Sequence, residues 1–149
     1  MIKKNLPTIN VIIIFIIFSL GYFLSTLLRA VPATISPFLI SEFNFSASEL
    51  GLLGGAYFAG FALMQLPLGY LLDIYGPKLI LSIFLIFAVI GVLLFCSANE
   101  FKYLFLGRFL IGVGVSACLM APLTGYRTWF KDIYQYRANS WMLMVGSIG

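Results

Sequence analysis

The chain has 149 residues, of which 62% are hydrophobic and only 9% are charged, and its mean hydropathy is +1.06. A soluble domain carries about a quarter charged residues, so this composition excludes an ordinary soluble protein and predicts an all-α membrane protein. The net charge of +4 does not indicate nucleic acid binding, because the nine basic residues are scattered between apolar runs. The two cysteines lie in separate apolar runs and histidine is absent, so neither a metal site nor a cofactor is expected.

The first apolar run begins near Ile9 and carries no charge until Arg29. A secretory signal is the alternative interpretation, but the run is longer than the about 7 to 15 residues of a signal core, and further spans follow at once. We therefore expect a retained first helix over residues 9–40. Pro32 and Pro37 are expected to kink this helix.

Three further complete spans are expected over residues 47–72, 77–97 and 103–128. Ser46 and Glu49 have the spacing of a capping box, which marks the start of the second span. Gly76 and Pro77 lie in the polar turn that follows and suit the start of the third span. The connections are too short for a folded domain outside the membrane.

A fifth span begins near Ala138 and has only 12 residues before the sequence stops at Gly149. Twelve helical residues extend about 18 Å, whereas the hydrocarbon layer is about 30 Å thick. We therefore expect an incomplete N-terminal helical bundle, with four complete spans and a truncated fifth over residues 138–149. A split gene, a frameshift and an incomplete sequence would each produce such a chain.

The basic residues predict the orientation, because cytoplasmic segments of membrane proteins carry an excess of Lys and Arg. With a cytoplasmic N-terminus, the inner segments hold Lys3, Lys4, Lys78, Arg127, Lys131 and Arg137. The outer segments hold Lys102 together with Glu42, Glu49 and Glu100. We expect a multi-pass protein of the cell inner (plasma) membrane whose N-terminus is cytoplasmic.

The most specific motif lies between the second and third spans, from Gly69 to Lys78. Gly69 and Asp73 are four residues apart and share one helix face, where a neighbouring helix is expected to approach the glycine and meet the carboxylate. Asp73 lies at a helix C-terminus, where the dipole disfavours an anion, so it should need a cationic partner. Gly76 permits the turn, and Lys78 adds a cytoplasmic charge.

This motif resembles the signature of the major facilitator superfamily, G-x-x-x-D-[RK]-x-G-[RK]-[RK], which lies between the second and third helices of that family. The matching residues are Gly69, Asp73, Gly76 and Lys78. Ile74 and Pro77 stand where the family usually has basic residues. The resemblance implies a cytoplasmic loop that gates the transporter through contacts with a second half, which is missing here. An ordinary polar turn is the alternative, which the coinciding helix count and topology disfavour.

A second resemblance lies in the fourth span, where the stretch from Arg108 to Ala117 is similar to the R-x-x-x-G-x-G-x-A pattern of the same family. Gly112 and Gly114 within it are expected to let neighbouring helices approach closely. The same packing role is expected of Ala117, Ala121 and Gly125, and of Gly51, Gly55 and Ala59 in the second span. Arg108 lies about 8 Å from the outer helix end, so it either acts within the span or extends to the interface.

Arg29 carries the sharpest substrate hypothesis, because a charge within a span is costly and marks a pathway or a counter-ion by default. If the helix ends at Arg29, the guanidinium reaches outer water; if the helix continues to about Ile40, Arg29 needs the protein interior. A polar stripe favours the second interpretation and comprises Tyr22, Ser25, Thr26, Arg29, Ala33 and Ser36. Pro32 also frees the carbonyl of Leu28, as in a helix shaped around a site.

The surroundings of Arg29, with an aromatic-rich stretch before it and Pro37 after it, resemble the organophosphate:phosphate antiporter branch and related anion carriers. This resemblance implies that an arginine on the first helix binds the anion. A guanidinium suits phosphate or carboxylate because it donates two parallel hydrogen bonds. Tyr57, Phe61 and Gln65 line one face of the second span, where they either contact substrate or only pack. The candidate substrate-binding residues are Arg29, Tyr22, Thr26, Tyr57 and Gln65.

Together these features predict part of a secondary transporter for a small anionic solute, which works by alternating access. Its expected partners are the solute, the lipid bilayer and the missing C-terminal half, and this fragment alone is not expected to transport. The alternative is a non-transporting small membrane protein or a degenerate gene product. An enzyme is not expected, since no carboxylate pair or nucleophile with a base is visible. The absence of Asp, Glu and His from the middle of the spans favours anion exchange over proton symport.

Overall fold

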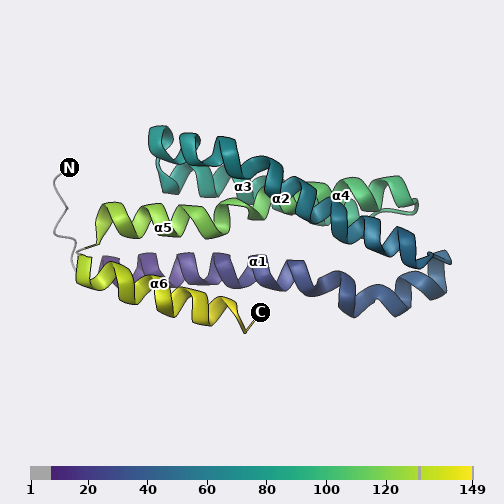
Figure 1. Cartoon of the computed structure of the whole chain (residues 1–149), viewed down its shortest axis with the longest axis horizontal. Coiled ribbons are helices and arrows are strands. Elements are labelled where there is room, and N and C mark those ends of the chain that lie inside the picture. Colours follow the sequence, from purple (N-terminus) through teal and green to yellow (C-terminus); the bar gives the residue numbers. More distant parts are fainter. Residues whose placement is uncertain (1–7, 131, 149) are drawn as a thin grey trace.

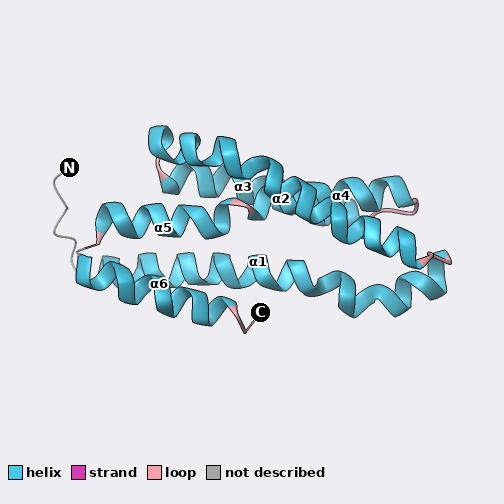
Figure 2. Cartoon of the chain, in the orientation of Figure 1, coloured by secondary structure: helices cyan, strands magenta, loops and turns pink. Residues whose placement is uncertain are grey.

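The computed structural model describes residues 8–130 and 132–148, which form helices joined by short turns (Figures 1 and 2). The helices are α1 (Thr8–Phe43), α2 (Ala47–Tyr75), α3 (Pro77–Cys96), α4 (Phe101–Val115), α5 (Ala117–Trp129) and α6 (Asp132–Gly146). Within these described ranges, four segments are long and apolar enough to cross a membrane: α1, α2, α3 and the combined α4 and α5. The predicted all-α membrane fold with four apolar spans is thus confirmed.

The first two connections are set by local hydrogen bonds. The expected capping box forms at the start of α2, where the Ser46 hydroxyl accepts a hydrogen bond from the Glu49 N–H at 3.3 Å and the Glu49 carboxylate accepts one from the Ser46 N–H at 2.8 Å. Gly76 then separates α2 from α3 with a φ of +81°, a conformation that favours glycine. Its N–H donates to the carbonyl of Leu72 at 3.0 Å, and Pro77 begins α3.

The fourth span is broken, whereas the sequence predicted one helix over residues 103–128. α4 ends at Val115 and α5 begins at Ala117. Pro122 has no N–H for the carbonyl one turn before it, and the Ser116 hydroxyl donates to the carbonyl of Val113 at 2.7 Å. Both features bend helices, and they account for the break.

The last helix begins earlier than the apolar pattern indicates. α6 starts at Asp132 rather than near Ala138, so Arg137 lies within a helix and not in the connection before it. Ala138 and Met142 are buried one turn apart, which shows the helical period. The apolar run therefore covers only the later turns of this helix, and the polar turns before it are helical too.

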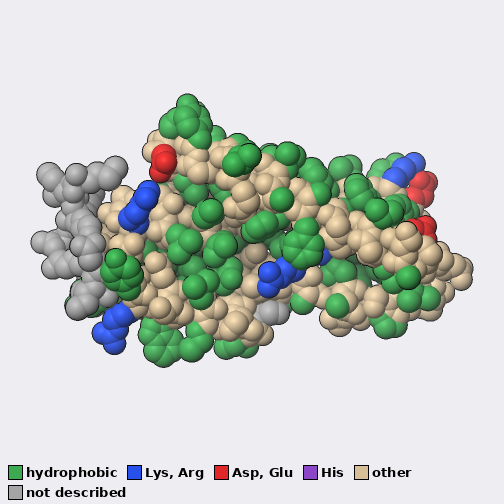
Figure 3. All heavy atoms as spheres, in the orientation of Figure 1, with side chains coloured by type: hydrophobic (Ala, Val, Ile, Leu, Met, Phe, Trp, Pro, Cys, Tyr) green, Lys and Arg blue, Asp and Glu red, His purple; other side chains and the backbone are tan. Residues whose placement is uncertain are grey.

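The connections alternate between the two ends of the bundle (Figure 1). The turns between α1 and α2 and between α3 and α4 lie at one end, while the turns from α2 to α3 and from α5 to α6 lie at the other. Figure 3 shows most of the charged side chains on this face at the two ends of a largely apolar surface, with a basic group part-way along. Lys3, Lys4 and Lys131, which contribute to the predicted orientation, lie outside the described residues.

Close backbone contacts at glycines hold α4 against α2 and α3. A Cβ added at Gly112 would collide with the carbonyl oxygen of Tyr57 in α2, and one added at Gly114 would lie 2.6 Å from the Cα of Ala88 in α3. Small residues allow membrane helices to approach in this way. The α4 helix is therefore the centre of the packed bundle, and Ile111 beside these glycines is buried.

The corresponding small residues of α2 do not pack as expected within this chain. A Cβ added at Gly51 or Gly55 would have nothing within 4 Å among the described residues. Ala59 on the same face is exposed. Among the described residues this face of α2 meets no other helix, because α4 contacts α2 on the face that holds Tyr57 and Gly60. The packing role expected of this face stays a prediction.

Candidate functional site

A cavity of about 100 Å³ lies between α1, α2 and α5. Its lining includes Tyr22, Ser25, Thr26, Arg29, Tyr57 and Phe61. Four of the five candidate substrate-binding residues therefore lie around one space. The fifth, Gln65, is outside this lining, and its half-buried side chain has a buried Nε2 atom with no hydrogen-bond partner among the described residues.

The depth of Arg29 follows from the length of α1, which continues through Pro32 and Pro37 to Phe43 as one helix of 36 residues. Arg29 lies slightly beyond the middle of this helix, and not at its outer end. Its side chain is exposed at the rim of the cavity and reaches toward the space lined by Tyr57. A charged side chain midway along an apolar span is costly without a counter-ion, so the guanidinium is a candidate binding group for an anion.

Tyr57 forms the floor of the cavity and is held from two directions. Its side chain is only 3% exposed, and its hydroxyl donates a hydrogen bond to the carbonyl of Ser25 in α1 at 3.4 Å. The ring of Tyr57 faces the guanidinium of Arg108, whose Cζ atom lies 5.0 Å from the ring centroid. Thr26 uses its hydroxyl as a donor within α1, to the carbonyl of Phe23 at 2.8 Å, which leaves the oxygen lone pairs as acceptors.

The sequence left open whether Arg108 acts within its span or extends to the membrane interface. It is only 2% exposed, and its Nη1 atom donates a hydrogen bond to the carbonyl of Leu28 at 2.9 Å. The interpretation in which Arg108 extends to the membrane interface is therefore wrong. Pro32 is the feature of the sequence that pointed to this contact. Because a proline has no N–H, the carbonyl four residues before it, that of Leu28, lacks its helical donor.

Asp73, in the motif at the other end of the bundle, has the expected cationic partner in a different helix. Its carboxylate lies 3.6 Å from a guanidinium nitrogen of Arg127 in the last turn of α5, and both side chains are mostly exposed. Lys78 is exposed in the first turn of α3. A Cβ added at Gly69 would meet nothing within 4 Å, so the helix that was expected to approach this glycine is not among the described residues.

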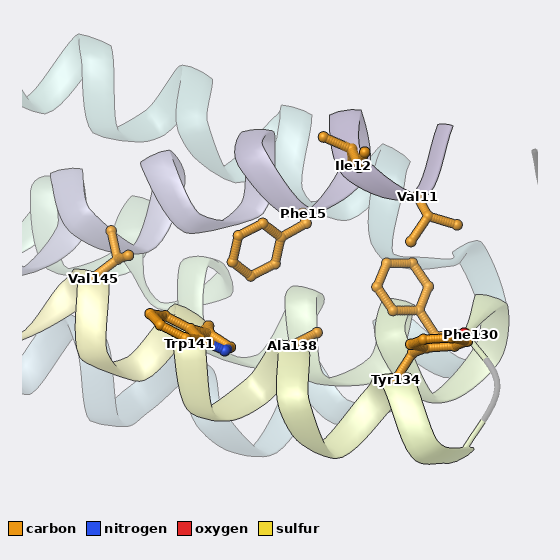
Figure 4. A pocket seen from close by; sticks show the side chains of 8 residues that line it. All are labelled: Val11, Ile12, Phe15, Phe130, Tyr134, Ala138, Trp141 and Val145. Atoms are coloured by element: carbon orange, nitrogen blue, oxygen red, sulfur yellow. The ribbon is translucent and has the colours of Figure 1, made fainter. Parts of the chain in front are cut away.

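Two larger cavities lie elsewhere in the bundle. An open groove of about 390 Å³ lies between α1 and α6, and Figure 4 shows Phe15 of α1 facing Ala138 and Trp141 of α6 across it. This groove is lined by apolar and aromatic side chains and offers almost nothing to orient a polar solute. A cavity of about 480 Å³ near Lys78 and Ser82 is also mainly apolar. Lys78 and Ser82 give that cavity a cation and one hydroxyl group beside two aromatic rings. The cavity at Arg29 differs in that its cation lies midway along a span and is accompanied by the hydroxyl groups of four residues, Tyr22, Ser25, Thr26 and Tyr57.

Known proteins resemble this chain over most of its length. A family model described as the Major Facilitator Superfamily matches residues 18–149. The chain is 34% identical over 97 residues to the nitrate/nitrite transporter NrtP of Picosynechococcus sp., an alignment that covers 64% of this chain and 18% of the relative. It is 28% identical over 131 residues to the hexuronate transporter of Escherichia coli, covering 88% of this chain and 30% of the relative.

A third relative is the probable sulfoacetate transporter SauU of Cupriavidus necator, which is 26% identical over 110 residues. That alignment covers 74% of this chain and 26% of the relative. The chain thus spans less than a third of the length of these curated relatives. No solved structure matches the chain significantly.

Proposed function

Because this chain belongs to the major facilitator superfamily, we propose that it is part of a secondary transporter that carries a small anionic solute across the cell inner membrane. The observation that carries the proposal is the cavity at Arg29, which Tyr22, Thr26 and Tyr57 line together with this arginine from midway along α1. In this arrangement Arg29 donates paired hydrogen bonds to the anion, and the hydroxyl groups contact its remaining polar atoms.

The chemistry of the relatives supports an anionic solute. Their names refer to nitrate and nitrite, to hexuronate and to sulfoacetate, all of which are anions at neutral pH. The solutes differ in size, but each presents a planar or tetrahedral oxyanion that a guanidinium binds. Arg29, a cation within the first span, is therefore the feature of this chain that fits the negative charge shared by those solutes.

The small size of the cavity supports a site that is completed by a second half. Its volume of about 100 Å³ is well below the about 300–1,000 Å³ of typical ligand pockets, so it can hold the oxyanion group of a solute but does not enclose a whole hexuronate. In alternating access, two helical halves rock around a central site to which both contribute residues. We propose that this chain supplies the half of the site that holds Arg29, and that the described fragment binds the anion more weakly than the whole transporter does.

We also propose that the N-terminus is cytoplasmic. Lys78, Arg127 and Arg137 belong to the helix ends that meet at one end of the bundle, whereas Lys102 and Glu100 form an ion pair at the opposite end. An excess of basic residues marks the cytoplasmic side. The motif with Asp73 and Lys78 would then face the cytoplasm, where it gates the movement of the two halves.

Binding of anions to the purified chain in lipid nanodiscs tests the role of Arg29. Calorimetry with nitrate, glucuronate and sulfoacetate, and with neutral glucose as the control solute, would compare wild type with Arg29→Gln. Loss of a charged hydrogen-bond donor is expected to weaken anion binding about tenfold to hundredfold. Arg137→Gln removes the same charge from α6 outside the cavity and should leave the affinity unchanged. Equal affinities of wild type and Arg29→Gln would contradict the proposal and favour a non-transporting membrane protein.

A further inference from the structure

An interhelical hydrogen bond replaces one that a proline removes from α1. Pro32 lies inside α1 and has no N–H for the carbonyl of Leu28. That carbonyl instead accepts a hydrogen bond from Nη1 of Arg108 in α4 at 2.9 Å, across 80 residues of sequence. Arg108 is 2% exposed, so the contact lies in the protein interior, where an unpaired carbonyl is costly.

The second proline of α1 shows a different solution to the same problem. Pro37 has no N–H for the carbonyl of Ala33, and the hydroxyl of Ser36 in the same helix donates to that carbonyl at 3.0 Å. This site is exposed and involves no other helix. The comparison shows that a freed carbonyl does not by itself require an arginine, because a neighbouring hydroxyl suffices.

Arg108 also touches the cavity through Tyr57. Its guanidinium lies over the Tyr57 ring at 5.0 Å from the centroid, and the Tyr57 hydroxyl donates to the carbonyl of Ser25 at 3.4 Å. Ser25 and Leu28 belong to the turn of α1 that directly precedes Arg29. That turn is therefore held by two contacts from neighbouring helices, one made by Arg108 itself and one by the tyrosine whose ring Arg108 covers.

We propose that Arg108 is a positioning residue for the anion site. It supplies the donor that Pro32 lacks and fixes the turn of α1 that carries Arg29 against α2 and α4. The planar guanidinium suits this role, because one edge donates to Leu28 while its face stacks on Tyr57. A lysine ammonium, as a point charge on a flexible stem, cannot maintain both contacts with the same geometry. The link to Arg29 rests on the proposed anion site, whereas the contact with Leu28 does not.

A double-mutant cycle isolates the contact with Leu28. Pro32→Ala restores a backbone N–H that can donate to the Leu28 carbonyl, so it should make the Arg108 donor redundant. Arg108→Met is expected to lower the melting temperature of the chain in nanodiscs, and to lower it by less than half as much in the Pro32→Ala background. Pro37→Ala is the matched control, since it restores the donor for Ala33 and should leave the effect of Arg108→Met unchanged. If Arg108→Met fails to fold, recovery of folding with Pro32→Ala but not Pro37→Ala supports the proposal.

The affinity for an anion separates positioning from direct binding. Using the tightest binder among nitrate, glucuronate and sulfoacetate, Arg108→Met should weaken binding about tenfold, and Pro32→Ala should restore most of that loss. Arg108→Lys keeps the charge and should still weaken binding. Additive effects of Arg108→Met and Pro32→Ala on melting would overturn the proposal, and so would an affinity that Arg108→Lys fully preserves. If neither the wild type nor any variant binds any of the anions, the proposed function fails. The melting temperatures of the double-mutant cycle would still test the contact between Arg108 and Leu28.

Discussion

The carboxylate of Asp73 at the end of α2 lies 3.6 Å from the guanidinium of Arg127 in the last turn of α5. The two charges have opposite relationships to their own helices. An anion at a helix C-terminus is disfavoured by the helix dipole, whereas a cation there is favoured. The Asp73 carboxylate therefore lies at a helix end that disfavours its charge, and the nearby Arg127 guanidinium compensates for this. The pair is at the turn that contains the family motif.

This relationship predicts unequal effects of the two neutral substitutions. Asp73→Asn removes an unfavourable dipole interaction together with an exposed ion pair worth about 1 kcal/mol or less, so the unfolding free energy should hardly change. Arg127→Gln removes a favourable dipole interaction and leaves Asp73 without its partner, so it should destabilise the chain more. Thermal unfolding in nanodiscs measures both variants. A larger loss from Asp73→Asn than from Arg127→Gln would contradict this account.

The glycines of α4 and α2 are expected to respond differently to alanine. In Gly112→Ala the added methyl group meets the carbonyl of Tyr57, so α2 and α4 must separate, at a cost of about 1–3 kcal/mol. In Gly55→Ala the methyl group meets nothing within 4 Å, and the higher helix propensity of alanine should leave stability equal or slightly greater. The melting temperatures of the two variants test this expectation. A similar decrease in melting temperature for both would show that α2 and α4 are not packed as described.

The proposed orientation predicts which thiols are accessible from outside the cell. In a background where Cys96 and Cys118 are replaced by alanine, Lys102→Cys should react with a membrane-impermeant maleimide in intact cells. Lys78→Cys should react only after the cells are permeabilised, because the turn before α3 faces the cytoplasm in this proposal. The reverse pattern of labelling would invert the topology. Labelling of both positions in intact cells would contradict a bundle whose connections alternate between its ends.

The parts of this structure that sequence reasoning predicted correctly depend on interactions between near neighbours. The capping box needs only Ser46 and Glu49 at a fixed spacing, and the turn before α3 needs a glycine that adopts positive φ. The four spans follow from apolar runs long enough to cross a bilayer. Such features are visible in one sequence because the interacting groups are at most a few residues apart.

The parts that were missed depend on contacts between distant segments. Leu28 and Arg108 are 80 residues apart, so the sequence showed a carbonyl without a donor but not which side chain would supply one. The expected cationic partner of Asp73 had several candidates, and helix packing selects Arg127. Gln65 shares a helix face with Tyr57 by spacing, yet it lies outside the cavity at Arg29. Helical spacing predicts a shared face, but the position of neighbouring helices decides which part of that face borders a cavity.

The most direct test of the central claim is protection of individual arginines from chemical modification by an anion. Wild-type chain in nanodiscs would be treated with phenylglyoxal with and without glucuronate, and the rate at each arginine would be followed by mass spectrometry. Arg29 and Arg137 are both exposed, so both should react in the absence of anion. We predict that glucuronate slows the modification of Arg29 and leaves the rate at Arg137 unchanged. Equal rates at Arg29 with and without nitrate, glucuronate or sulfoacetate would contradict an anion site at this residue.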